Sequence, residues 1–241
     1  MKMIGIIFSD VYGSELEELT RSRTVASMPF GGRYRQIDFA LSNMVNSDIF
    51  NIGVITNQNY RSLVDHLGSC QEWDLNRKKG GVHILPTAMS EKVAKEHSGK
   101  LDELRAALFF LKQETAEYVL LSDTNIIFNI DYRDVLESHV KSGCDITVVA
   151  KKTVENEKRP HEITLEVNEN GDCRSISINY PAKKGMFKGM GSFIMSREKL
   201  VEIIEEYTAR GNYSFKRDYI QRPVSYTHLY NRSLTCAATH Q

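Results

Sequence analysis

The sequence predicts an α/β fold with a doubly wound, mostly parallel sheet. Short runs of branched apolar residues recur along the 241-residue chain, and segments with helical periodicity lie between them. These runs are almost continuously apolar rather than alternating, which is typical of strands buried on both faces of a parallel sheet. Strands that alternate with helices form βαβ units. The predicted strands are 3–8, 51–56, 81–85, 118–122 and 145–150.

Helices are expected between these strands, where apolar side chains recur every three or four residues. The segment 37–45 has this spacing, and two later segments share it. Such a stripe gives a helix one apolar face that can pack onto the sheet. The two later stripes are Leu101, Leu104, Leu108 and Leu111, and Val135, Leu136 and Val140.

The pattern changes after residue 150. The segments 163–167 and 175–180 alternate apolar and polar residues, and the turn sequence 168–171 lies between them. Alternation around a short turn is typical of a β-hairpin. We therefore expect a small antiparallel insertion here rather than another βαβ unit.

One further strand and one further helix are predicted after the hairpin. Residues 191–195 are strand-like, and the hydroxyl of Ser196 can cap a helix that runs through Arg210. Gly211 then stands where a helix commonly ends in a left-handed residue.

Composition and charge exclude several classes of protein. Lys and Arg together number 31, as do Asp and Glu, so no overall positive field would attract nucleic acid or an anionic membrane. The four cysteines are widely spaced without a C-x-x-C pair, as in a reducing compartment, and the first apolar run is too short for a signal peptide or a membrane span. We expect a cytoplasmic protein. The cysteines are Cys70, Cys144, Cys173 and Cys236.

The segment 29–43, PFGGRYRQIDFALSN, closely resembles the sugar-phosphate nucleotidyltransferases. More narrowly it resembles glucose-1-phosphate adenylyltransferase, which supplies ADP-glucose for bacterial glycogen. The resemblance covers roughly residues 3–221 and implies a Rossmann-like domain over 1–222. Further similar stretches are 46–49, 53–56, 72–77 and 81–86.

The resemblance ends near residue 223. Family members continue into a left-handed β-helix, whereas residues 223–241 have no hexapeptide repeat. We expect this tail to be poorly ordered and the β-helix domain to be absent.

The family's chemistry joins several negative charges, so it needs glycine amides and basic side chains for the triphosphate and carboxylates for Mg²⁺. At the first loop, two family glycines are replaced by Asp10 and Val11. Glu15 replaces the family's arginine, and Val25 replaces its lysine, so attraction for phosphate is lost or reversed. The vestige of the nucleotide loop is Gly13 and Ser14.

The metal positions are altered as well. Alignment through Asp131 and Tyr132 places Asn125 on the family's first metal aspartate, and an amide is a poorer Mg²⁺ ligand than a carboxylate. Asp123, two residues earlier, could substitute after a register shift. Asp218 matches the family's second metal aspartate. These two aspartates are the metal candidates.

The positions that resemble the sugar-phosphate site have also changed. His97 stands at an aromatic position, in a stretch where 96–103 resembles the family pattern W-Y-x-G-T-A-D-A. Asn179 and Tyr180 replace a Glu-Lys pair, which removes both charges, and Gly189 replaces a serine.

Three functions remain open. The resemblance favours a non-catalytic regulatory or structural subunit of the GlgD type, which joins a catalytic glucose-1-phosphate adenylyltransferase in a hetero-oligomer and needs no cofactor itself. The second is an active enzyme that makes ADP-glucose from ATP and glucose 1-phosphate, with Mg²⁺ on altered ligands such as Asp123, Asp218 and His97. The third is a stand-alone binding protein for a sugar phosphate or nucleotide that uses Arg33 and Arg35, although we expect Arg35 to be tied to a carboxylate.

Overall fold

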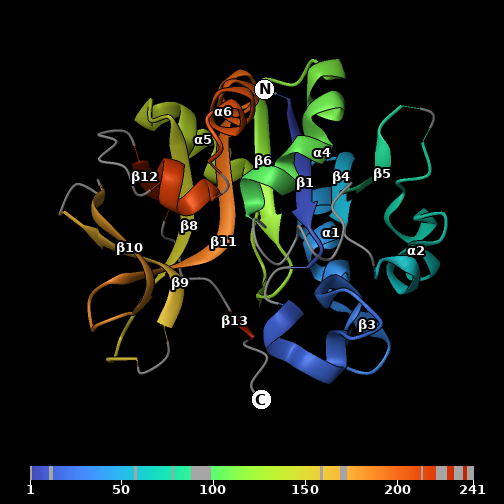
Figure 1. Ribbon diagram of the computed structural model, residues 1–241, viewed down its shortest axis with the longest axis horizontal. Coiled ribbons are helices and arrows are strands. Elements are labelled where there is room, and N and C mark those ends of the chain that lie inside the picture. The colour runs from blue at the N-terminus through green and yellow to red at the C-terminus, as the bar shows by residue number, and fades with distance from the viewer. Residues whose placement is uncertain are drawn as a thin grey trace.

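A nine-stranded sheet with a parallel central part and helices on both faces forms the centre of the molecule (Figure 1), which confirms the predicted fold class. The computed structural model describes residues 2–10, 13–56, 59–77, 79–87, 99–157, 160–168, 173–212, 214–220, 227–230 and 236–237. The strands are β1 (Met3–Phe8), β4 (Asn51–Thr56), β5 (Gly81–Pro86), β6 (Tyr118–Asp123), β8 (Ile146–Lys152), β9 (Pro160–Val167), β10 (Cys173–Pro181), β11 (Phe187–Ser196) and β12 (Thr227–Tyr230).

The strand order is β10-β9-β11-β6-β1-β4-β5, and β8 joins the sheet beside β11. β1 lies between β4 and β6 and is parallel to both, while β5 continues the parallel part beside β4. β11 runs antiparallel to β6 and β8. The β9–β10 hairpin attaches to the sheet through β11, so the predicted antiparallel insertion is confirmed.

Two buried apolar clusters lie on opposite faces of the sheet. Ile6 and Phe8 of β1 belong to the cluster that contains α4 and α6, whereas Ile7 belongs to the cluster with α1, α2 and α5. Successive side chains of a strand point to opposite faces, so a strand buried on both faces must be apolar throughout. The helices are α1 (Gln36–Asn46), α2 (Arg61–Leu67), α4 (Lys100–Gln113), α5 (Tyr132–Ser142) and α6 (Arg197–Ala209).

Short elements complete the described chain. The segment before α1 contains two 3₁₀ helices and a two-stranded ribbon, and a π-helical turn follows α6. These elements are η1 (Gly13–Thr20), η2 (Val25–Ser27), β2 (Pro29–Phe30), β3 (Tyr34–Arg35), η3 (Gln71–Trp73), β7 (Ile127–Phe128), η4 (Phe215–Ile220) and β13 (Cys236–Ala237).

The predicted cap of α6 is confirmed, and one predicted apolar stripe needs correction. Ser196 Oγ accepts a hydrogen bond of 3.1 Å from the Lys199 amide at the start of the helix. On α5, Val140 is exposed although Val135 is buried. The buried face turns instead through His139, whose Nδ1 lies 2.8 Å from Thr147 Oγ1 on β8.

Two pieces of the tail form strands. β12 pairs in parallel with β8, and β13 pairs antiparallel with β7. Because these pairings are long-range, the local sequence offered no signal for them. The division into 1–222 and 223–241 stays a prediction, and none of the described segments is a β-helix. No helix in the described part of the chain is long and apolar enough to cross a bilayer.

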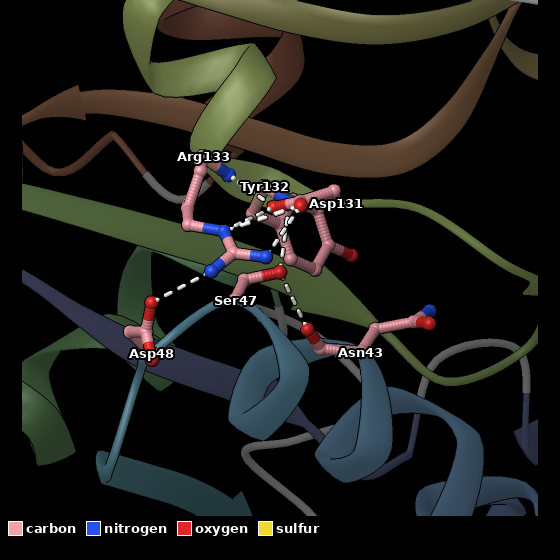
Figure 2. Close-up of polar contacts among 6 residues, drawn as sticks. All are labelled: Asn43, Ser47, Asp48, Asp131, Tyr132 and Arg133. Atoms are coloured by element: carbon pink, nitrogen blue, oxygen red, sulfur yellow. Dashed lines mark hydrogen bonds and ion pairs between the residues drawn. The ribbon is translucent and has the colours of Figure 1, made fainter.

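A buried hydrogen-bond chain joins the end of α1 to the start of α5 (Figure 2). The Ser47 hydroxyl donates to the Asn43 carbonyl at 2.7 Å and accepts from the Tyr132 amide at 2.8 Å. The Asn43 side-chain amide donates to the Phe128 carbonyl at 2.8 Å. One serine therefore satisfies a helix-terminal carbonyl and a helix-terminal amide at once.

An exposed cluster of ion pairs lies beside these buried hydrogen bonds (Figure 2). Arg133 Nη2 lies 2.7 Å from Asp131 Oδ2, and its Nη1 lies 2.9 Å from Asp48 Oδ2. The hydrogen bonds from Arg133 hold the pKa of Asp131 below its usual range. Asp131 also caps α5 by accepting from the Arg133 amide.

Candidate functional site

The carboxyl ends of β1, β4 and β6 meet at one edge of the sheet, where open α/β sheets commonly bind ligands. Backbone hydrogen bonding extends beyond the strands, since the Ser9 amide donates to the Ile55 carbonyl at 3.1 Å. The hydroxyls of Ser9 and Thr56 are buried there, and neither they nor the Asn125 side-chain carbonyl hydrogen-bond within the described structure. This edge therefore offers polar atoms to a ligand.

The start of the first loop is hydrogen-bonded to η2. Asp10 Oδ1 accepts a hydrogen bond of 3.3 Å from the Val25 amide, and the Ala26 amide donates to the Ser9 carbonyl at 2.8 Å. The Val25 side chain is only 1% exposed. Where the resemblance implies a lysine facing phosphate, this chain has an apolar side chain in its interior.

The rest of the predicted nucleotide loop is described by its backbone alone. η1 begins at Gly13 and includes Ser14 and Glu15. Val11 lies outside the described residues, as does His97, the predicted aromatic-position residue of the sugar-phosphate site. The roles assigned to these residues stay predictions.

Asp123, the alternative metal candidate, ends β6 with its side chain buried against a lysine. Lys100 Nζ lies 2.5 Å from each carboxylate oxygen of Asp123. The side chains are 9% exposed for Lys100 and 1% exposed for Asp123. Lys100 is not among the site residues predicted from the sequence. The available signal was a lysine in the stretch 96–103 at a position where the family pattern has threonine.

Two rings and one glycine surround this pair. Lys100 Nζ lies 5.0 Å from the centre of the Phe8 ring and 5.8 Å from that of Phe193. Gly191 on β11 has a φ of +71°, and a Cβ placed on it would approach Asp123 Oδ2 to 2.8 Å. Apolar walls and a close backbone thus enclose the ion pair.

Two further ionisable groups share the electrostatic field of this pair. Burial raises the pKa of Glu103 to about 7, although Lys100 opposes the shift. Burial also lowers the pKa of Lys216, in η4, to about 7, and the positive charge of Lys100 adds to that shift. Neither residue was predicted as a site residue.

Asp218 lies in η4, and its carboxylate Oδ2 accepts a hydrogen bond of 2.9 Å from the Ser214 amide. The Asp218 amide donates to the Ser214 carbonyl at 2.8 Å, so this aspartate closes its own turn. Among the described residues, no three His, Cys, Asp or Glu side chains are grouped so that they could hold a metal ion.

The predicted sugar-phosphate residues of the hairpin lie apart from the first loop. Asn179 and Tyr180 belong to β10, and the strand order puts β9, β11 and β6 between β10 and β1. Asn179 has a φ of +53°, and the Tyr180 carbonyl accepts from Thr164 Oγ1 at 2.8 Å. Gly189 lies within the β11 ladder opposite Ala150.

The two arginines proposed for a binding protein differ in their surroundings. Arg33 is exposed, with its guanidinium carbon 5.2 Å from the centre of the Tyr34 ring. Arg35 Nη1 donates to the carbonyl and the hydroxyl of Ser62, both at 2.7 Å. The Arg35 amide donates to Asp38 Oδ2 at 3.0 Å, so a carboxylate does bind this residue, through its backbone and not through its guanidinium.

Comparison with known proteins agrees with this architecture. The model of the family described as nucleotidyl transferase matches residues 4–235. The chain belongs to the nucleotidyl transferase family. The family resemblance inferred from residues 29–43 is thereby confirmed.

Two kinds of curated protein are similar to this nucleotidyl transferase. The chain is 39% identical over 148 residues to the glycogen biosynthesis protein GlgD of Bacillus subtilis. This alignment covers 61% of this chain and 43% of GlgD. The chain is 30% identical over 222 residues to glucose-1-phosphate adenylyltransferase of Thermotoga neapolitana. That alignment covers 91% of this chain and 52% of the Thermotoga enzyme. The chain therefore spans about half the length of the curated relatives it matches.

A solved structure supports the fold of this nucleotidyl transferase. A Bacillus anthracis protein described as a glucose-1-phosphate thymidylyltransferase superposes with a TM-score of 0.74. The alignment covers 98% of this chain and 89% of that protein, at 20% sequence identity. At that identity the match concerns the fold alone.

Proposed function

We propose that this chain is a regulatory or structural subunit that is itself catalytically impaired. It joins a catalytic glucose-1-phosphate adenylyltransferase in a hetero-oligomer and acts in glycogen biosynthesis. The proposal is supported by similarity to both GlgD and glucose-1-phosphate adenylyltransferases. No cofactor is needed for this role.

The observation that carries the proposal is the hydrogen bond that ties Asp10, at the start of the first loop, to η2. The Asp10 carboxylate accepts from the Val25 amide at 3.3 Å, and the Val25 side chain is buried. A triphosphate needs amide donors and a basic side chain at such a loop. Here the Asp10 carboxylate already accepts the hydrogen bond of one amide, and an apolar side chain, Val25, stands at the position of the basic side chain.

The frame around the altered site is intact. The cluster beneath α4 and α6 and the cluster beneath α1 and α5 are both filled with buried apolar side chains. A packed interior keeps the outer surface in one shape, and subunit assembly depends on that surface rather than on the chemistry at the carboxyl edge of the sheet. Loss of catalysis is therefore compatible with a retained role in assembly.

The test measures pyrophosphate release from ATP, Mg²⁺ and glucose 1-phosphate. This chain is assayed alone, and then with the catalytic adenylyltransferase encoded in the same genome. We expect no turnover by this chain alone, co-elution of the two chains in size-exclusion chromatography, and altered kcat or KM of the mixture. An unrelated protein of similar size, added at the same concentration, controls for non-specific effects.

The other outcomes identify the alternatives. Robust turnover by this chain alone would overturn the proposal in favour of an active sugar-phosphate nucleotidyltransferase. Absence of both co-elution and a kinetic effect would also overturn it. Calorimetric titration with ATP, ADP-glucose and glucose 1-phosphate would then test the stand-alone binding protein.

A further inference from the structure

The carboxylate that ends β6 already has a cation of the protein's own. Both oxygens of Asp123 lie 2.5 Å from Lys100 Nζ, and the pair is almost wholly buried. A buried carboxylate is costly unless it is paired and hydrogen-bonded, and here one ammonium group does both.

The space around this ion pair is taken up by the protein. The Phe8 and Phe193 rings lie 5.0 and 5.8 Å from Lys100 Nζ. The Gly191 backbone is so close that a Cβ there would lie 2.8 Å from Asp123 Oδ2. A second cation beside Asp123 would have to displace the ammonium group or enter against its charge.

The residues at the family's two metal positions are weaker donors for a divalent ion than the Asp123 carboxylate. Mg²⁺ requires about six oxygen ligands in near-octahedral geometry, commonly including one or two carboxylates and several waters. Asn125 contributes only a neutral amide where the family has an aspartate. The Asp218 carboxylate is directed to the Ser214 amide, at 2.9 Å.

We infer that Lys100 replaces a divalent cation at the end of β6 and excludes Mg²⁺ from Asp123. Any anionic ligand that binds at this edge of the sheet then does so without a metal ion at that carboxylate. The inference does not rest on the proposed function, because a catalytically impaired subunit could still bind a metal ion. The ammonium group of Lys100, on α4, thus neutralises the carboxylate of Asp123 at the end of β6.

The test is a titration of the full chain with Mn²⁺, followed by electron paramagnetic resonance of the free ion. Four proteins are compared: wild type, Lys100→Thr, Lys112→Thr, and the double variant Lys100→Thr with Asp123→Asn. Lys112 is the matched control, since it lies on the same helix in an exposed ion pair with Glu205.

We expect wild type and Lys112→Thr to show no Asp123-dependent site up to about 1 mM free Mn²⁺. Lys100→Thr should gain one Mn²⁺ per chain, with a dissociation constant at least about tenfold below 1 mM. The double variant should lose this site. A folded Lys100→Thr protein that gains no site would overturn the inference.

A second measurement needs no variant. In wild type, Mn²⁺ bound at Asp123 would selectively broaden the amide resonances of Phe8, Asp123 and Gly191. Unchanged relative intensities support the inference even if Lys100→Thr does not fold. Selective broadening of these three amides would overturn it.

Discussion

The backbone of Gly191 lies directly against the side chain of Asp123. A Cβ built on Gly191 would approach both Cβ and Oδ2 of Asp123 to 2.8 Å, and Gly191 has a φ of +71°. Two requirements, a left-handed backbone and a close approach, thus coincide at one residue of β11. The position of Asp123 beside Lys100 depends on both.

Gly191→Ala should therefore destabilise the protein by about 2–4 kcal/mol, since left-handed strain and overpacking add. The control is Gly143→Ala at the end of α5, where φ is +64° but no atom lies within 4 Å of the added Cβ. That variant should lose only about 1 kcal/mol. Urea unfolding measures both, and equal losses would contradict the steric explanation.

Ser47→Ala should cost about 1–2 kcal/mol of unfolding free energy, because the buried Tyr132 amide would lose its acceptor. The Asn43 carbonyl would lose a donor at the same time. Ser175→Ala is the control, because its exposed hydroxyl donates to Glu166 Oε2 at 3.2 Å. Thermal unfolding followed by circular dichroism compares the two, and a similar fall in Tm for both would refute the prediction.

Glu103→Gln should change the pH dependence of stability. The folded-state pKa of Glu103 is raised from 4.5 to about 7 by burial. Its contribution is therefore fully present below pH 4.5 and is lost as the pH rises through 7. The variant cannot ionise, so its stability relative to wild type should rise by at most about 3 kcal/mol across this window.

Urea unfolding between pH 4 and 8 measures this difference. Glu202→Gln serves as the control, because Glu202 is an exposed residue of α6 that forms a surface ion pair with Lys199. A pH-independent difference between Glu103→Gln and wild type would show that Glu103 ionises as an ordinary surface carboxylate.

Lys216→Met should affect the opposite end of the pH range. The pKa of Lys216 is lowered from 10.5 to about 7, chiefly by burial. Its contribution is present above pH 10.5 and is lost as the pH falls through 7. Methionine carries no charge, so the variant should gain stability relative to wild type as the pH is lowered from 10.5 to 7.

Guanidinium unfolding at pH 7, 8.5 and 10 tests this trend. Lys112→Met is the matched control, since Lys112 is an exposed lysine of α4. The control should follow wild type at each pH. If Lys216→Met does so too, then Lys216 stays charged in the folded protein over the whole range.

Much of the fold follows from local sequence. The runs 3–8 and 51–56 coincide with β1 and β4, because a strand buried on both faces has to be apolar throughout. The Ser196 cap was equally readable, since it involves residues three apart. Val140 was misjudged because the orientation of α5 on the sheet decides which side chains are covered.

The candidate site, like the fold, could be predicted from the sequence only in part. Substitutions such as Val25 and Asn125 were visible as departures from a family pattern, and that pattern indicated the family that the comparisons confirm. Their consequences were not visible. The bond from the Val25 amide to Asp10 joins residues fifteen positions apart.

The sequence by itself determined the fold class, the family and the places where the family's charged residues are missing, because periodicity and motif spacing are local properties. Only the tertiary structure decided that Lys100 neutralises Asp123, with the Gly191 backbone against that carboxylate. These residues come from α4, β6 and β11. Burial and distance between such elements exist only after the chain has packed, and they determine how the carboxylate of Asp123 is paired.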